Sequence, residues 1–215
     1  MHKVLLKIKI KIVEVISKIV NYLYERICRL RLKNKKFSII CSNCIGGVIY
    51  HRLNMEFLSP TINLWLRQYD FVKMILNLDT YMKYDLKFIE TSYSFPVALL
   101  GDIKIHFNHS KNKEEAKSEW NKRKSRILWD DIFIILYDRD NLTKEQILSL
   151  RNIRCKNLIV LSENCNYQDI DYVYHIKRTN KNRENEQVFL DKDIFGIRTF
   201  EKQWDFVKWL NKKEK

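Results

Sequence analysis

The sequence predicts an α/β fold in three layers, with helices on both faces of a mostly parallel sheet, preceded by a basic amphipathic helix. Short runs of continuous apolar residues alternate with segments of helical spacing, which is typical of strands buried on both faces. The chain contains only 4 Gly and 2 Pro, and this favours long regular elements over elaborate loops. We expect an N-terminal helical segment over 1–36 and a single α/β domain over 37–215.

The composition indicates a folded protein of a reducing compartment. Hydrophobic residues make up 46% and aromatic residues 13% of the chain, which argues against a disordered protein. The five cysteines are irregularly spaced, so they do not indicate a secreted disulfide framework. No apolar run approaches the roughly 18 residues of a membrane span, and the N-terminus lacks the apolar core of a secretion signal. We therefore expect a cytoplasmic protein that could touch the inner face of the membrane peripherally.

The first 36 residues are strongly basic and amphipathic. They hold eight Lys and three Arg against Glu14 and Glu25, and so carry +9 of the net charge of +14. The apolar stripe could pack on the protein's own core, pair with a second copy, or lie on an anionic membrane surface through residues 1–33. Nucleic-acid binding is disfavoured, because the charges are not joined to a groove-reading motif. The stripe recurs at steps of three and four and consists of Leu5, Ile8, Ile12, Ile16, Ile19, Leu23, Ile27 and Leu30.

The elements up to residue 107 begin with a strand. The apolar run at 37–40 is predicted to be a buried strand, and a short helix is expected to begin within 46–53. A turn follows at Ser59-Pro60, and 69–90 shows helical spacing. Two apolar segments then follow at 96–102 and 103–107.

The second half carries the strongest signals. The run DIFIILYD (131–138) is the clearest strand, and a helix through residue 126 is expected before it, where Asn112 and Glu115 resemble a capping box. Thr143 is expected to cap a short helix over 143–150. The remaining predicted elements are strands at 156–163 and 171–176 and an amphipathic helix at 201–210.

The blocks at 37–65 and 106–127, with the following strand, resemble a bacterial family of unknown function whose members are often labelled exopolysaccharide or capsule biosynthesis proteins. The matching motifs are the Ser-Asn-x-Cys turn with Gly-Gly, Ser-Pro-x-x-Asn-Leu, and a histidine ahead of Glu-Glu-Ala and Trp. The resemblance implies a three-layer α/β/α fold and a role in surface-polysaccharide assembly, such as a sugar-modifying transferase. Cys41 departs from the expected pattern, so chemistry that depends on Cys41 would not be a family trait.

The turn CSNCIGG (41–47) directly follows the first predicted strand and could serve several chemistries. Structural zinc needs four Cys or His ligands, and Cys41 with Cys44 supplies one close pair without a second. A thioredoxin-type redox pair is also a weak interpretation, because the glycines after Cys44 would loosen the first helical turn. The simplest alternative is that Cys44 is a small buried side chain beside a tight corner.

Cys44 is the candidate nucleophile in the sharper interpretation. The amides of 45–47 would lower the pKa of its thiol and hold an oxyanion during acyl transfer. A histidine must then act as the base, and His109 and His106 follow another predicted strand, whose end should lie at the functional edge of the sheet. The carboxylates that could orient this imidazole are Asp102 and Glu115.

The same turn could bind a phosphate without any nucleophile. The amides between Asn43 and Gly47, including that of Gly46, lie at a predicted helix start, where the phosphate of a nucleotide-sugar or of coenzyme A could bind. The pattern matches no standard glycine-rich fingerprint. Arg123 and Arg126, one helical turn apart, could grip a pyrophosphate.

Each of these residues has a structural alternative. Arg123 lies four residues after Glu119, so the two arginines could instead form a solvated ion-pairing face. Asn63 could bond a sugar hydroxyl or simply hold its own loop. Trp120 could stack on a sugar or belong to the core.

The sequence therefore predicts a transferase of bacterial cell-surface polysaccharide biosynthesis, with acyl transfer to a sugar ahead of glycosyl transfer. Coenzyme A or its acyl form would be the donor, and no metal is expected. The nearest approach to an Asp-x-Asp nucleotide-sugar motif is Asp138-Arg139-Asp140. The alternatives are a non-catalytic, membrane-associated scaffold or binding protein of glycan assembly and a nucleotide-sugar binder of the glycosyltransferase kind.

Overall fold

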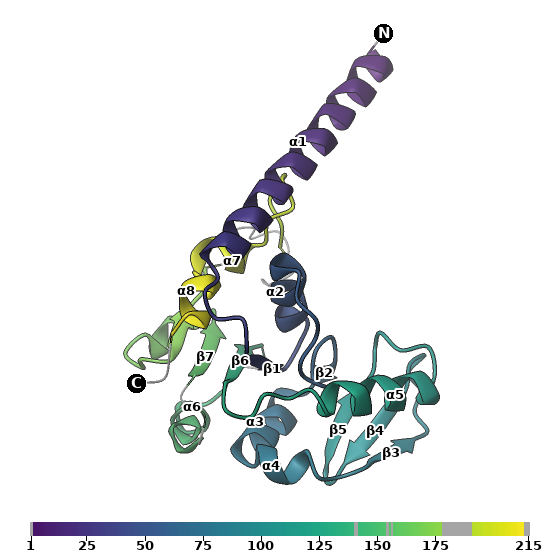
Figure 1. The fold of residues 1–215 in the computed structure, drawn as a ribbon, viewed down its shortest axis with the longest axis vertical. Coiled ribbons are helices and arrows are strands. Elements are labelled where there is room, and N and C mark those ends of the chain that lie inside the picture. Colours follow the sequence, from purple (N-terminus) through teal and green to yellow (C-terminus); the bar gives the residue numbers. More distant parts are fainter. Residues whose placement is uncertain (1, 140–141, 154, 156, 178–190, 213–215) are drawn as a thin grey trace.

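The computed structural model describes residues 2–139, 142–153, 155, 157–177 and 191–212 (Figure 1). It confirms the predicted α/β fold with an N-terminal helix. The central sheet is entirely parallel, with the strand order β1-β6-β7-β8. Its strands are β1 (Ser38–Cys41), β6 (Ile132–Asp138), β7 (Asn157–Ser162) and β8 (Val173–His175).

Both faces of this sheet are covered, which explains the continuous apolar strands. On one face Ile39, Phe133 and Ile135 pack in a core with residues of α2 (Ile45–Leu53), α7 (Thr199–Gln203) and α8 (Phe206–Leu210). On the other face Ile40 and Ile134 pack in a core with residues of the remaining helices and the second sheet. Successive side chains of a strand point to opposite faces. A strand that is buried on both faces is therefore a continuous apolar run instead of an alternation of apolar and polar residues.

A second, antiparallel sheet is the main feature that the sequence did not predict. It has the order β2-β5-β4-β3, and it is inserted between β1 and β6. The predicted helical segment at 69–90 was wrong in its second half, because that stretch ends in a strand. The elements of this insertion are β2 (Trp65–Leu66), α3 (Gln68–Leu76), α4 (Leu78–Tyr81), β3 (Leu86–Ile89), β4 (Val97–Leu100), β5 (Ile103–His106) and α5 (Lys113–Lys124).

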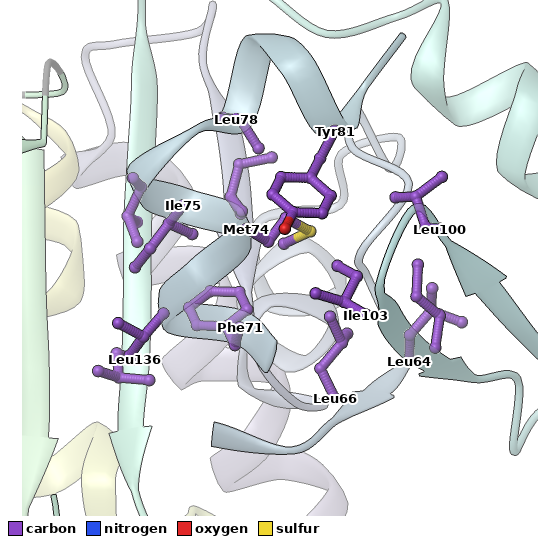
Figure 2. Packing of buried hydrophobic residues seen from close by; sticks show 14 of the residues in the cluster. Leu64, Leu66, Phe71, Met74, Ile75, Leu78, Tyr81, Leu100, Ile103 and Leu136 are labelled. Carbon is purple, nitrogen blue, oxygen red and sulfur yellow. The ribbon is translucent and has the colours of Figure 1, made fainter. Parts of the chain in front are cut away.

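Helix α3 joins the two sheets. Figure 2 shows Phe71, Met74 and Ile75 of this helix between Leu136 of β6 on one side and Ile103 of β5 on the other. All five side chains are at least 98% buried. The insertion is therefore fixed against the carboxyl half of the central strand, and this position lets both sheets contribute to one cleft.

The helix ends follow local hydrogen bonding. The Oδ1 of Asn112 accepts from the amide of Glu115 at 2.8 Å and caps α5 as predicted. Thr143 forms a complete capping box with Gln146 at the start of α6 (Lys144–Ser149). The single helix predicted at 201–210 is instead two short helices, because Trp204 is extended between them and packs against Trp209 with ring centroids 5.1 Å apart. The remaining helical turns are η1 (Leu150–Asn152) and η2 (Cys165–Tyr167).

Helix α1 (His2–Arg31) extends well beyond the body, and only its C-terminal half lies beside α2, α7 and α8 (Figure 1). Cys28 is buried in that contact, and the side chains of Ser17 and Asn21 donate to the carbonyls of Ile194 and Phe195. The predicted apolar stripe does not pack on the core. Over the residues whose side chains are described, the stripe faces solvent, and the side that contacts the body is the more polar one.

Within the described ranges, no helix combines the length and the apolar character that crossing a bilayer requires.

Candidate active site

A cleft of about 520 Å³ lies where the carboxyl ends of β1 and β6 meet the second sheet. In open parallel sheets this edge is where ligands bind, because loops that follow neighbouring strands converge there. One wall comes from the central sheet and the start of α2, and the other from β2 and the loops around β4 and β5. The residues that line the cleft are Ser42, Asn43, Cys44, Leu64, Trp65, Leu66, Gln68, Tyr93, Phe95, Asn108, His109, Tyr137 and Arg139.

The cleft brings Cys44 and His109 together. The Sγ of Cys44 lies 3.6 Å from the Nε2 of His109, although the residues are 65 positions apart in the sequence. Cys44 is the N-cap residue of α2, and His109 belongs to a turn closed by the amide of Ser110 donating to the carbonyl of Phe107 at 2.9 Å. Sulfur and nitrogen are within contact for proton transfer, which is the geometry that a thiol nucleophile and its general base require.

The electrostatics of Cys44 differ from the expectation of a lowered pKa. Burial raises the pKa of its thiol above the usual value, and the positive charge of Arg198 opposes this only in part. The amides of the turn are used elsewhere. The amide of Ile45 donates to the Oδ1 of Asn43 at 2.9 Å, and the amides of Asn43 and Gly46 bond to the sulfur of Cys41. Two of the three amides that were expected to form an oxyanion hole, those of Ile45 and Gly46, are therefore already bonded.

Cys41 contacts the amides of the turn, but its side chain is not exposed to the cleft. Its side chain is completely buried, and burial raises the pKa of its thiol to about 12 in spite of the surrounding amides. Its Sγ also donates to the Oδ1 of Asn43 at 3.3 Å. A thiol in this setting is a packed core group, so Cys44 is the cysteine of the turn that meets the cleft.

The raised pKa of Cys44 predicts slow alkylation at neutral pH. Iodoacetamide reacts with the thiolate, and a raised pKa keeps the thiol protonated through neutrality, so the rate should climb with pH to beyond about pH 9. Arg198→Gln removes the opposing positive charge and should slow labelling at any fixed pH. Peptide mass spectrometry after timed labelling measures this at Cys44 alone. A rate that levels off below pH 7 would show a preformed thiolate and contradict the expectation.

An aromatic wall stands beside the cysteine–histidine pair. Tyr93 and Phe95 are stacked with ring centroids 4.9 Å apart, and Tyr93 contacts Trp65 edge-on at 5.9 Å. Tyr93 is 42% exposed and so presents ring surface to a ligand. The indole N–H of Trp65 is buried and has no hydrogen-bond partner among the described residues. Arg139 lies over the Trp65 ring at 5.6 Å and adds a positive charge to this side.

His106 does not share the role of His109. It is 2% exposed, its ring lies 4.2 Å from that of Trp65, and its Nδ1 is 3.1 Å from the Trp65 carbonyl. Burial lowers the pKa of His106, so it is held neutral. His106 therefore packs behind the aromatic wall and supports it. The prediction that His106 could act as the base was wrong.

The predicted orienting carboxylates are also placed elsewhere. Glu115 accepts from the amide of Lys111 at 2.6 Å and does not line the cleft. Asp102 pairs with Lys73 and accepts from the hydroxyl of Tyr81 at 2.7 Å, and it lines a different hollow. Among the residues that the structure describes, no carboxylate lines the cleft, so neither predicted carboxylate orients His109 there.

The two glycines of the turn serve packing. A Cβ on Gly46 would lie 2.7 Å from the Cδ1 of Ile62, and a Cβ on Gly47 would overlap the side-chain oxygen of Asn63. Asn63 itself adopts a left-handed backbone with φ of 59°. The glycines let α2 approach the 59–64 loop closely, and neither lines the cleft, so the phosphate cradle predicted here is not supported.

The predicted phosphate and sugar contacts on α5 and just after it do not line this cleft. Arg123 pairs with Glu119 and donates to the carbonyl of Ile62 at 3.2 Å, as the structural alternative predicted. Arg126 pairs with Glu56 at 2.7 Å. Trp120 is 1% exposed in the core and cannot act as a sugar platform.

Asp138 is a structural carboxylate at the end of β6. It is buried and accepts from Gln68, Leu142 and Ser162, each at 2.8 Å. These bonds tie the ends of β6 and β7 to the start of α3, beneath the cleft. Asp140, the other acid of the Asp-x-Asp-like motif, lies outside the described residues. In the part of the chain that the structure describes, no group of three His, Cys, Asp or Glu residues is placed to hold a metal ion.

Sequence reasoning missed most of the cleft lining. Arg139 had a usable signal, because it directly follows the strongest predicted strand and therefore had to lie at the carboxyl edge. Asn108 is adjacent to His109 and could have been included with it. Trp65, Tyr93 and Phe95 reach the cleft only through the second sheet, which the sequence did not reveal.

The fold and cleft define the class of protein: an α/β protein with a cysteine–histidine pair at the carboxyl edge of a parallel sheet. Residues 15–211 match the family described as "Domain of unknown function (DUF1919)", and the chain belongs to this family. The chain is also similar to an uncharacterized protein of Haemophilus influenzae, with 32% identity over 201 residues that cover 94% of this chain and 97% of that protein. The predicted membership of a family of unknown function is thereby confirmed.

Proposed function

We propose that the protein is a transferase of bacterial cell-surface polysaccharide biosynthesis that moves an acyl group to a sugar hydroxyl. The observation that carries this proposal is the 3.6 Å separation of the Cys44 Sγ and the His109 Nε2 inside a cleft. A thiol and an imidazole in contact are the two groups that thioester-mediated acyl transfer needs. The polysaccharide context rests on the resemblance of the motifs around the turn.

The chemistry has two balanced steps, with an acyl-coenzyme A as the donor. The Cys44 sulfur attacks the thioester carbonyl while His109 accepts the thiol proton, then the bond to coenzyme A breaks and its sulfur takes that proton. In the second step a sugar hydroxyl attacks the acyl-cysteine, and His109 moves the hydroxyl proton to the departing Cys44 sulfur. The cleft thereby exchanges one thioester for an ester and regenerates both side chains.

The raised pKa of Cys44 makes His109 the essential partner in this scheme. A protonated thiol is a poor nucleophile, so the proton must leave as the carbon–sulfur bond forms. Asn108 and Arg139 are the lining residues beside the aromatic wall that carry N–H donors for the oxyanion or the donor phosphates.

The aromatic wall supports a sugar as the acceptor. Carbohydrates present C–H faces that pack on rings, and Tyr93 offers such a surface in the same cleft as the thiol. The unpartnered indole N–H of Trp65 is a donor that a hydroxyl oxygen could satisfy.

A second function is favoured by the same wall: a non-catalytic glycan-binding protein. Its supporting observation is the raised pKa of Cys44, which leaves the resting thiol neutral. Such a protein would retain saccharide in the cleft whether or not Cys44 is present, and this separates it from a transferase.

The test is an acyl-transfer assay with the full chain. Acetyl-coenzyme A is mixed with a panel of bacterial surface oligosaccharides, and both coenzyme A release and acylated oligosaccharide are measured by chromatography and mass spectrometry. We expect release that depends on a particular oligosaccharide and an equal yield of acylated product. Saccharide binding without any coenzyme A release, across acyl donors of several chain lengths, would favour the binding protein.

A further inference from the structure

The apolar stripe of α1 faces solvent, whereas the apolar stripe of a surface helix normally faces the core. Its described members are between 43% and 78% exposed. Exposed apolar side chains that form one continuous line indicate an interaction surface, whereas scattered ones do not. These members are Ile12, Ile16, Ile19, Leu23, Ile27 and Leu30.

The side of α1 that faces the body is fixed by specific contacts. Ser17 and Asn21 bond the 194–195 backbone, and the hydroxyl of Tyr24 donates to the carbonyl of Glu201 at 3.3 Å. Cys28 is buried on the same side. At 100° per residue this side lies opposite the apolar stripe, so the docked helix holds the stripe outward.

The charges on α1 are sorted between these two sides. Lys11, Lys18 and Arg26 are exposed and, by helical spacing, lie along one flank of the stripe. The acidic residues Glu14 and Glu25 fall on the side toward the body, where Glu25 pairs with Arg29. Glu14 is also exposed and lies one turn before Lys18, so the acidic residues border the basic flank on the side away from the stripe. The outward surface is therefore an apolar line with a positive flank between it and the acidic residues.

We propose that α1 docks the protein on an anionic membrane surface, with the apolar stripe in the interface and the basic flank at the lipid headgroups. Amphipathic helices with this arrangement bind at the boundary of headgroups and acyl chains, and each basic residue near the surface strengthens the attraction. This inference is independent of the proposed transfer reaction, because none of its residues lines the cleft.

The spacing of the stripe favours a flat surface over a second helix. From Ile12 to Leu30 the steps are four, three, four, four and three residues, which follow the turn of a straight α-helix. A left-handed coiled coil needs the shorter average of a heptad repeat, so a stripe of this kind would drift away from a partner helix. A planar lipid surface can meet the whole line at once.

The test is co-sedimentation of the full chain with vesicles. Neutral phosphatidylcholine vesicles are compared with vesicles that contain phosphatidylglycerol, at low and high salt. We expect at least about tenfold tighter binding to the anionic vesicles, with a loss at high salt. The double variant Ile19→Glu and Leu23→Glu should bind at least about tenfold more weakly. Lys83→Glu makes the same change in net charge away from α1 and should bind like the native protein.

Further measurements keep the outcomes separate. Circular dichroism checks that the double variant is folded. A second variant, Lys11→Gln with Lys18→Gln, leaves the stripe intact and should weaken only the salt-sensitive part of the binding. Cys44→Ser should bind vesicles like the native protein. Equal sedimentation with neutral and anionic vesicles would overturn the proposal. So would a lipid-free dimer, seen by analytical ultracentrifugation, that the double variant abolishes, or salt-dependent binding of generic DNA through the same residues.

Discussion

Replacing Cys44 by serine is expected to lower acyl transfer at least about a thousandfold, equivalent to roughly 4 kcal/mol of transition-state stabilisation. Serine has a side chain of similar size, but its hydroxyl is a far weaker nucleophile than the thiol of Cys44. Its proton is also harder for His109 to remove across the 3.6 Å that separate the pair. Transfer is measured by coenzyme A release and by acylated oligosaccharide, with saturating acetyl-coenzyme A. Because the residue is half-buried at a helix start, the variant should fold like the native protein.

His109→Asn should reduce transfer by about a hundredfold to ten-thousandfold, the usual contribution of a general base. His109 is exposed, so this change costs little stability. Cys165→Ser, which alters an exposed cysteine outside the cleft, is the matched control and should leave transfer unchanged. Retained transfer in both Cys44→Ser and His109→Asn would remove the catalytic pair from the account.

Replacing Arg52 by methionine should lower the free energy of unfolding by about 3–5 kcal/mol. Its guanidinium binds both carboxylate oxygens of Glu201, at 2.7 and 3.2 Å, and also reaches the Asn21 side chain at 2.6 Å. The Glu201 side chain has no exposed surface, so removing Arg52 leaves a buried charge without its partner. This ion pair joins α2 to α7 and to α1. Urea unfolding followed by circular dichroism measures the loss.

Arg126→Met is the matched control for Arg52→Met. Arg126 pairs with Glu56, whose side chain is 62% exposed, and an ion pair of this kind contributes less than about 1 kcal/mol. The double variant Arg52→Met with Glu201→Leu should recover part of the loss, because it removes both buried charges together. Similar unfolding energies for Arg52→Met and Arg126→Met would show that the buried pair does not secure α1.

The fold was predictable where periodicity and burial act locally. The strands β6 (Ile132–Asp138) and β7 (Asn157–Ser162) are buried on both faces, so each forms one apolar run in the sequence and was predicted as part of the parallel sheet. The second sheet was not predictable in the same way. Its strands are short and partly exposed, and the 69–90 segment follows a helical period although its end pairs with β4. Whether such a short segment forms a strand is decided by its packing and pairing with neighbouring segments, which hydrophobic spacing does not show.

The candidate pair was predictable in part. Cys44 and His109 each follow a strand, and their proximity was predicted from the convergence of strand ends in one parallel sheet. The two residues do meet, but the reason was wrong, because His109 follows β5 of the antiparallel sheet and not a strand of the central sheet. The electrostatics of the two thiols could not be predicted from the sequence. Cys41 and Cys44 are only three positions apart, yet the sulfur of Cys41 is buried among the amides of the turn while Cys44 lines the cleft. The spacing of the two residues does not show which sulfur points into the core.

The amphipathic N-terminus shows a similar limit. A stripe of apolar residues on a helix is compatible with burial or with exposure, and the sequence alone left both open. In the structure, Ser17, Asn21 and Cys28 hold the helix to the body, which turns the more hydrophobic side outward. The hydrogen bonds of Ser17 and Asn21 and the burial of Cys28 therefore set the orientation, and the hydrophobic pattern did not predict them.

The most direct measurement of the central claim is mass spectrometry of the protein after brief exposure to acetyl-coenzyme A without an acceptor sugar. We expect one added acetyl group, located on Cys44 by peptide mapping, absent from Cys44→Ser and slower to form in His109→Asn. Addition of an acceptor oligosaccharide should remove the acetyl group. An unmodified Cys44 in the native protein, while product still forms with an oligosaccharide acceptor, would contradict the covalent route.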